Sequence, residues 1–207
     1  MTRAEAPAPV MVLAAGHGRR MGGPKALAIW RGRTFLAHIL ERCAESGSPV
    51  TLVADPALRE RLAALAAGQS GALSIRWVES GGSLPMLASV QAALALGGFD
   101  AGCWLWPVDA PFLSAAGWAR LSADAAEQPG RVLKPRAGGR NGHPVWFPAW
   151  AVPRIAAGRW QNGLLGFLAE CRPEQVRVLD LPGEVVADVN TPEELERVEA
   201  DTAGETR

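Results

Sequence analysis

The sequence contains little lysine, no excess of charge of either sign and no long apolar stretch. Lysine occurs only at positions 25 and 134 of the 207 residues, and the 21 basic residues balance 21 acidic ones. A net charge of zero without a basic block argues against a nucleic-acid-binding protein. The apolar runs are short and are interrupted by glycine, proline or charge, so no transmembrane span is predicted.

Cysteine is also scarce. Cys43, Cys103 and Cys171 are far apart, odd in number and without the spacing of metal ligands. They are therefore expected to be buried or free thiols in a reducing cytoplasm. Residues 1–7 lack the apolar core of a secretion signal, so the sequence predicts a cytoplasmic protein.

Apolar stretches typical of strands alternate with stretches of helical periodicity, which predicts a mostly parallel sheet with helices on both faces. The predicted strands are Val10–Ala14, Val50–Ala54, Ile75–Val78, Cys103–Val108 and Val176–Leu179. The predicted helices are Phe35–Ser46, Pro56–Ala67, Leu87–Leu96, one from the N-cap Ser114 to about Ala126, one around Gly163–Cys171 and one starting at Thr191. The fold class is thus α/β, doubly wound.

The C-terminal half has a mixed pattern. Residues 131–134 and 145–147 are predicted as a strand pair around a turn at Gly138-Gly139. No linker, repeat or low-complexity segment divides the chain, and its length suits one domain. We therefore expect a single domain over residues 9–200, with flexible tails at 1–8 and 203–207.

The segment Leu13–Lys25 is a glycine-rich, basic loop directly after the first predicted strand. Its glycines allow a sharp turn and let backbone N–H groups come close to a ligand. Arg19, Arg20 and Lys25 add positive charge beside this backbone. Both features fit an anionic ligand such as a polyphosphate.

Two well-known phosphate loops do not match. A Walker loop requires Gly-Lys-Ser/Thr, but Pro24 separates Gly23 from Lys25, and Ala26 has no hydroxyl for Mg²⁺. The dinucleotide fingerprint G-x-G-x-x-G fails because Met21 stands at the third glycine position.

The loop does resemble the signature L-A-A/G-G-x-x-x-R-M-G-x-x-K of the molybdenum cofactor nucleotidyltransferases, at every fixed position. The similarity extends from Val10 to about Glu199 and implies a Rossmann-like nucleotidyltransferase fold whose loop wraps the triphosphate of a nucleotide. By this resemblance the nucleotide-binding residues are Leu13, Ala14, Ala15, Gly16, Gly18, Arg20, Lys25 and Ser89. Arg20, Lys25 and Asp109 are the implied catalytic residues.

Asp109 follows the strand at 103–108 and so lies at the edge where open α/β sheets bind ligands. The Asp109-Ala110-Pro111 segment resembles the family's metal-binding aspartate, and a carboxylate plus substrate phosphates is typical of Mg²⁺. The alternative is that Asp109 caps a turn. Because Ser114 already caps the next helix, the metal role is favoured.

A second metal ligand is expected near the C-terminus. Asp188-Val189-Asn190 resembles the family's D-I-D/N segment, and residues 188 and 190 point the same way if the chain is extended. Thr191 and Glu194 form a predicted capping box, which explains neither Asp188 nor Asn190. The sequence does not decide between these two as ligands.

Two further residues have both a functional and a structural interpretation. Ser89 follows Gly81-Gly82 where related enzymes have a serine that contacts the nucleoside, but a serine near a helix start is also a common cap. Gly142-His143-Pro144 resembles a segment of the cytidylyl-transferring branch, which puts His143 in the acceptor pocket. The alternative for His143 is a hydrogen-bonded structural histidine, and His17 has no assigned role.

The resemblance implies Mg²⁺-dependent transfer of a nucleoside monophosphate to a phosphorylated acceptor, with release of pyrophosphate. Ala14-Ala15-Gly16, Pro24-Lys25 and Gly142-His143-Pro144 favour the cytidylyltransferase branch, hence CTP and a molybdopterin acceptor, with a molybdoenzyme as a further partner. Two alternatives stay open: a sugar phosphate or other small phosphate as acceptor, or a nucleotide-binding module or chaperone for a molybdoenzyme.

Overall fold

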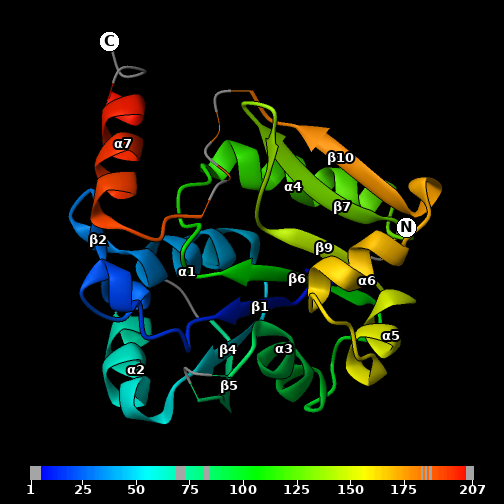
Figure 1. Cartoon of the computed structure of the whole chain (residues 1–207), viewed down its shortest axis with the longest axis horizontal. Coiled ribbons are helices and arrows are strands. Elements are labelled where there is room, and N and C mark those ends of the chain that lie inside the picture. Colours follow the sequence, from blue (N-terminus) through cyan, green and yellow to red (C-terminus); the bar gives the residue numbers. More distant parts are fainter. Residues whose placement is uncertain are drawn as a thin grey trace.

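A mostly parallel sheet runs through the computed structural model, as the alternating pattern predicts (Figure 1). The structure describes residues 6–68, 73–81, 84–182, 184, 186 and 188–203. Its strands are β1 (Val10–Leu13), β2 (Ile29–Trp30), β3 (Arg33–Thr34), β4 (Val50–Ala54), β5 (Ile75–Glu79), β6 (Gly102–Pro107), β7 (Val132–Ala137), β8 (Arg140–Asn141), β9 (Val145–Pro148) and β10 (Val176–Asp180). In the main sheet the order is β10-β7-β9-β6-β1-β4-β5, with β8 beside β7.

The strand β1 lies between β4 and β6, and all three run parallel. Leu13 at the end of β1 is paired in register with Pro107 at the end of β6. The antiparallel strand β9 separates β6 from β7 and produces the mixed half that the sequence predicts. The carboxyl ends of β1 and β6 therefore meet at one edge, which is where open α/β sheets bind ligands.

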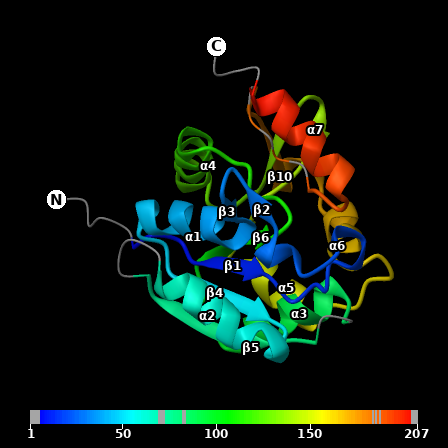
Figure 2. The same ribbon diagram turned by 90° about the vertical axis from the view of Figure 1, so that its left-hand side faces the viewer.

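Helices cover both faces of the sheet, which confirms the doubly wound α/β class. They are α1 (Phe35–Ser46), α2 (Arg59–Ala67), α3 (Met86–Leu94), α4 (Ala115–Glu127), α5 (Ala151–Ala157), α6 (Leu164–Glu170) and α7 (Pro192–Ala203). The turned view shows α1, α2 and α4 on one side of the strands and α3, α5 and α6 on the other (Figure 2). Among the described residues, no helix combines the length and the apolar character needed to span a bilayer.

The core consists of two apolar clusters, one on each face of the sheet. Val10 and Val12 pack into the cluster with α1, while Met11 between them packs into the cluster with α3. Because successive side chains of a strand point to opposite faces, a strand that is covered on both sides must be apolar throughout. This is why the central strands have no hydrophobic–polar alternation in the sequence.

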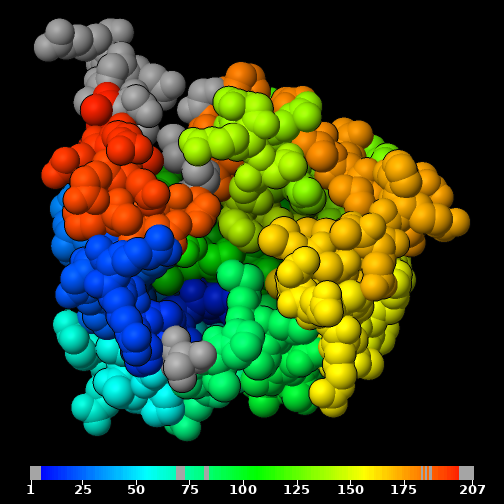
Figure 3. Space-filling view, viewed as in Figure 1, coloured from blue at the N-terminus to red at the C-terminus, as the bar shows by residue number. Residues whose placement is uncertain are grey.

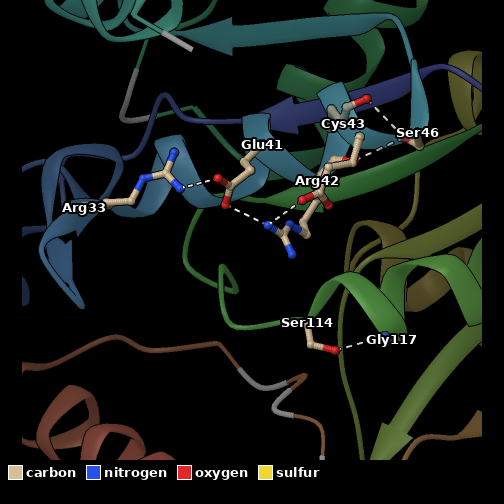
Figure 4. A network of polar contacts seen from close by, with 8 residues as sticks. Arg33, Glu41, Arg42, Cys43, Ser46, Ser114 and Gly117 are labelled. Carbon is tan, nitrogen blue, oxygen red and sulfur yellow. Dashed lines mark hydrogen bonds and ion pairs between the residues drawn. The ribbon is translucent and has the colours of Figure 1, made fainter. Parts of the chain in front are cut away.

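Helix boundaries follow from local capping. The Thr34 hydroxyl accepts a hydrogen bond from Ala37 N at 3.2 Å and starts α1. The Ser114 hydroxyl accepts one from Gly117 N at 3.0 Å and starts α4, as the sequence predicts (Figure 4). On the exposed side of α1, Glu41 bonds both Arg33 and Arg42, which are drawn in the same view.

Two predictions about local structure are wrong. Residues 56–67 do not form one helix: Pro56–Leu58 is a 3₁₀ turn, because the Asp55 carboxylate accepts from Ala57 N, and α2 starts only at Arg59. The turn at Gly138-Gly139 joins β7 to β8 and not to β9, because both glycines have positive φ and close a tight hairpin. The predicted pairing of β7 with β9 does occur, at Leu133 and Trp146.

The short elements β2, β3, β8 and α5 are not predicted from the sequence. The hairpin β2–β3 closes on Arg31 and Gly32, both with positive φ, and two-residue strands have no detectable hydrophobic period. Helix α3 starts one residue before the predicted Leu87 and ends at Leu94, not Leu96. Of the predicted tails, residues 1–5 and 204–207 lie outside the described residues.

Candidate active site

The glycine-rich loop leaves β1 with a row of backbone donors that have no backbone partner. Ala14 N still donates to Val53 O at 2.7 Å, but within the described chain the N–H groups of residues 15–18 donate to no backbone carbonyl. The loop is closed behind them, because Gly18 O accepts from Met21 N at 2.8 Å and from Gly23 N at 3.3 Å. Gly18 has φ +58°, a conformation that favours glycine. Consecutive N–H groups without a backbone partner in such a turn form a concavity for an anion.

A cavity of about 180 Å³ lies beside this loop at the carboxyl ends of β1 and β6. It is lined by Leu13, Ala15, Gly16, Gly18, Lys25, Gly81, Leu84, Met86, Ser89, Pro107, Val108 and Asp109. The space-filling view shows the molecule hollowed on this face, between the blue N-terminal loop, the green start of α3 and the red-orange C-terminal segment (Figure 3). The predicted loop and the predicted strand-end aspartate therefore share one cavity.

Two of the residues expected to bind nucleotide lie outside the lining. Ala14 is fully buried in the apolar cluster with α1, because its side chain points to the opposite face from that of Ala15. Arg20 is exposed in the 3₁₀ turn Arg19–Met21. The remaining predicted loop residues line the cavity, and so does Ser89.

Lys25 joins the loop to the expected metal ligands. Its Nζ donates to Asp109 Oδ2 at 2.8 Å and to Asn190 Oδ1 at 2.7 Å. Asn190 Nδ2 in turn donates to Asp188 Oδ2 at 2.7 Å. The side chains of Lys25 and Asp109 are only 15% and 21% exposed. Three segments far apart in the sequence thus meet in one polar network.

The C-terminal segment is fixed beside Asp109 by its backbone. Val189 N donates to Asp109 O at 2.9 Å, and Asn190 N donates to Glu194 Oε2 at 2.6 Å. The Thr191 hydroxyl accepts from Glu194 N at 3.3 Å, so Thr191 caps α7 as predicted. The other half of the predicted capping box is displaced by one residue, because Glu194 bonds the N–H of Asn190 and not that of Thr191.

Asp188 is held as a carboxylate. Burial acts to raise the pKa of Asp188. Its carboxylate accepts hydrogen bonds from the Asn190 amide and from the backbone N–H of Asp188 itself, and the charges of His143 and Lys25 lie nearby. Together these effects outweigh burial and lower the pKa below 3.8. At neutral pH, Asp188 therefore keeps its negative charge beside Asn190. This charge is available to a cation.

His143 lies deeper, next to the same C-terminal segment. Its backbone N–H donates to Val186 O at 2.9 Å, and a Cβ on the preceding Gly142 would lie 1.8 Å from the same oxygen, so only glycine fits there. The Nδ1 atom of His143 is buried without a hydrogen-bond partner in the described chain. Burial lowers the pKa of His143, against the charges of Asp109 and Asp188, which raise it. The imidazole of His143 is therefore neutral at pH 7, and His143 does not line the cavity.

A pH dependence of stability follows from His143. Because its folded-state pKa lies below the ordinary 6.5, the unfolded chain takes up a proton below about pH 6.5 that the folded protein does not. The free energy of unfolding is expected to fall as pH falls from 6.5 toward the folded pKa, with at most about 1.4 kcal/mol per pH unit for one proton. His143→Gln should reduce this slope in urea unfolding between pH 8 and 5.5.

Burial also lowers the pKa of His38, so His38 too makes the free energy of unfolding fall at lower pH. The variant His143→Gln should therefore keep part of the slope. The measurement at pH 8, where both histidines are neutral, gives the pH-independent cost of the substitution. An unchanged slope in His143→Gln would contradict the prediction.

Ser89 is not a helix cap. It is the fourth residue of α3, whose N-cap is Pro85 without a side-chain bond, and its hydroxyl shares a 2.7 Å hydrogen bond with Ser80. Of the preceding loop, residues 82–83 lie outside the described residues.

Two lining residues without a predicted role, Leu84 and Met86, are 53% and 48% exposed, and no pattern in the sequence distinguishes an exposed apolar residue from a core one.

The donor set fits a divalent metal ion that is completed by a ligand. No three His, Cys, Asp or Glu side chains in the described part of the chain are grouped to hold a metal on their own. Asp109, Asp188 and Asn190 offer two carboxylates and an amide oxygen, linked through Lys25 and each other. Mg²⁺ is a hard ion that prefers such oxygens and is commonly bound by one or two carboxylates plus substrate phosphates.

Part of the chain is similar in sequence to a curated protein. A 52-residue stretch is 40% identical to a probable molybdenum cofactor guanylyltransferase of Bacillus cereus; it covers 25% of this chain and 26% of that protein. The aligned part thus spans about a quarter of this curated relative.

Solved structures match nearly the whole chain. Rv0371c from Mycobacterium tuberculosis is 27% identical with a TM-score of 0.75, over 93% of this chain and 98% of that one. Its manganese complex has 26% identity and a TM-score of 0.70, over 93% and 97% of the two chains. The 4-diphosphocytidyl-2C-methyl-D-erythritol synthase of Anaerococcus prevotii, at 16% identity and TM-score 0.71 over 96% of each chain, shares the fold.

A family model matches residues 10–176, which include the loop, Ser89, Asp109 and His143 but end before Asp188 and Asn190. The match covers most of the chain, and its first part coincides with β1 and the loop that lines the cavity. The chain belongs to the family of the MobA-like NTP transferase domain.

Proposed function

We propose that this protein is a nucleotidyltransferase that moves a nucleoside monophosphate from a nucleoside triphosphate to a phosphorylated acceptor. The observation that carries this proposal is the convergence of Lys25, Asp109 and Asn190 beside the loop, whose N–H groups at residues 15–18 have no backbone partner in the described chain. Family membership and the guanylyltransferase relatives support it. An oxygen of the acceptor phosphate bonds to the α-phosphorus, the bond to the bridging oxygen of the β-phosphate breaks, and pyrophosphate leaves.

The residues of the chain contribute positioning and charge. The N–H groups of residues 15–18 and the ammonium of Lys25 bind the phosphates, and Arg20 reaches the departing pyrophosphate from the rim of the loop. A phosphate acceptor is already ionised, so no side chain has to remove a proton. This division of labour, with little covalent chemistry for the protein, is general for phosphoryl transfer.

The proposed metal ion is Mg²⁺, held by Asp109 with Asp188 or Asn190. When bound, it supplies positive charge to the phosphate oxygens. The manganese complex of the relative from M. tuberculosis supports a divalent ion. Ser89 is proposed to lie against the nucleoside and His143 against the acceptor, and residues 9–200 are proposed to act as one domain.

CTP is the proposed nucleotide and molybdopterin the proposed acceptor, because Ala14-Ala15-Gly16, Pro24-Lys25 and Gly142-His143-Pro144 resemble the cytidylyl branch. The second candidate nucleotide is GTP, favoured by the names of the curated relatives. A molybdoenzyme that receives the product and a cytoplasmic location, consistent with three free cysteines, complete the proposal.

The test is pyrophosphate release with Mg²⁺, each of the four triphosphates, and either molybdopterin or a sugar phosphate. We expect turnover with molybdopterin, and CTP faster than the other triphosphates by at least about tenfold, or about 1.4 kcal/mol in the barrier. A preference for GTP would assign the guanylyl branch. Turnover with the sugar phosphate alone would contradict the cofactor acceptor, and nucleotide binding without any pyrophosphate would favour a binding module.

A further inference from the structure

Lys25 lies between the oxygen atoms that we assign to the metal ion. Its Nζ is 2.8 Å from Asp109 Oδ2 and 2.7 Å from Asn190 Oδ1, and it donates to both. These two atoms come from the end of β6 and from the segment before α7. The only other lysine in the sequence is Lys134, in β7.

Hydrogen bonds to neighbouring groups hold the Asn190 amide and the segment around it in place beside Asp109. Asn190 Nδ2 is engaged by Asp188 Oδ2 at 2.7 Å, so the amide carbonyl has to face Lys25. Glu194 fixes the backbone of Asn190 at 2.6 Å, and Val189 ties the segment to the backbone of Asp109. An ammonium and a divalent cation both bind hard oxygen atoms, and two cations at the same pair of oxygens repel each other, so Lys25 competes with a metal ion for Asp109 Oδ2 and Asn190 Oδ1.

We propose that, in the nucleotide-free protein, Lys25 occupies the position of the metal ion beside Asp109 and Asn190 and suppresses metal binding until a triphosphate draws its ammonium away. The inference rests on the proposed function, because it takes the same site to bind both metal and triphosphate. The lysine side chain has four rotatable bonds and starts from the first residue of a 3₁₀ turn beside the loop, so it can exchange carboxylate for phosphate without a change of fold. Free metal then binds weakly, and metal and nucleotide bind cooperatively.

This cooperativity has a thermodynamic counterpart. If the release of Lys25 by the triphosphate strengthens metal binding, the metal must strengthen triphosphate binding by the same factor. Removing the ammonium abolishes the competition, so it should strengthen metal binding in the absence of nucleotide and weaken the coupling. A lysine that only binds phosphate would not affect metal binding in the absence of nucleotide.

The experiment measures Mn²⁺ binding to the nucleotide-free protein from the electron paramagnetic resonance signal of free Mn²⁺. Lys25→Met is expected to bind Mn²⁺ on the order of tenfold more tightly than the wild type, within the usual range of coupling between sites. The control is Lys134→Met, which removes the same charge from β7, away from the cavity lining. This variant should bind Mn²⁺ like the wild type. A non-hydrolysable CTP analogue should tighten Mn²⁺ binding in the wild type more than in Lys25→Met.

Two controls keep the result decisive. Circular dichroism and thermal unfolding establish that Lys25→Met is folded, and the double variant Lys25→Met/Asp109→Asn should lose the gain if Asp109 is the oxygen released. Equal or weaker Mn²⁺ binding by folded Lys25→Met overturns the proposal, as does the same gain in Lys134→Met. No turnover enters this test, so its failure is distinct from a failure of the proposed function, which wild-type pyrophosphate release decides.

Discussion

Replacing Asp109 with alanine is expected to lower the rate of pyrophosphate release by about 10³-fold or more, because metal-ion charge stabilisation is worth several kcal/mol. Asp109 contributes the carboxylate at the end of β6, which bonds Lys25 at 2.8 Å in a partly buried position. Asp109→Asn keeps the size and the acceptor for Lys25 but removes the charge. It should therefore be nearly as slow as Asp109→Ala.

The matched control for this prediction is Asp180→Ala. Asp180 is also a carboxylate at the end of a strand, β10, but it forms an exposed ion pair with Arg136 and does not line the cavity. Exposed pairs contribute about 1 kcal/mol or less to stability, so Asp180→Ala should stay folded and active. Turnover of Asp109→Ala within tenfold of the wild type would remove Asp109 from the proposed catalytic residues.

The second large effect is expected for Gly18→Ala, which should lower kcat/KM by about 10²-fold or more, since small displacements of a binding group have effects of this size. A Cβ at Gly18 would lie 2.0 Å from Gly23 O and 3.0 Å from Lys25 N. The φ of +58° adds about 1–2 kcal/mol of strain for any residue with a Cβ. The loop would have to move, and the N–H groups and Lys25 would move with it.

Gly23→Ala is the control for the loop. Gly23 does not have a positive φ, and a Cβ placed on it meets no atom within 4 Å. The variant adds the same methyl group to the same loop without a clash, and it should keep nucleotide binding close to that of the wild type. Titration calorimetry with the triphosphate measures both variants, and equal affinities of Gly18→Ala and Gly23→Ala would contradict the role of the closed loop.

Much of the candidate site is predictable because its signals are local. The loop up to Lys25 begins at Leu13, the last residue of β1, and Asp109 comes two residues after the end of β6, so a strand and the residues just after it suffice to place each at the edge of the sheet. Parallel strands bring such ends together whatever their separation in the sequence. The pairing of Asp188 with Asn190 is equally local, since side chains two residues apart in an extended segment face the same way.

Other features have no local signal. Ala14 and Ala15 are chemically identical in the sequence, but Ala14 is in the core and Ala15 lines the cavity, because the path of the chain just after β1 decides which side each faces. The displaced bond of Glu194 to Asn190 depends on how the segment before α7 meets β6. The Asp55 carboxylate converts the expected start of a helix into a 3₁₀ turn, which is a competition between two hydrogen-bonding patterns of similar energy.

The sequence by itself determined the α/β class, the position of the glycine-rich loop after β1 and the carboxylate of Asp109 after β6. Each of these depends on the spacing of a few neighbouring residues. The tertiary structure alone decided that Lys25 meets Asp109 and Asn190, which are 84 and 165 residues away along the chain. Contacts of 2.7–2.8 Å between such distant side chains depend on the order and twist of the whole sheet, and no local pattern encodes that geometry.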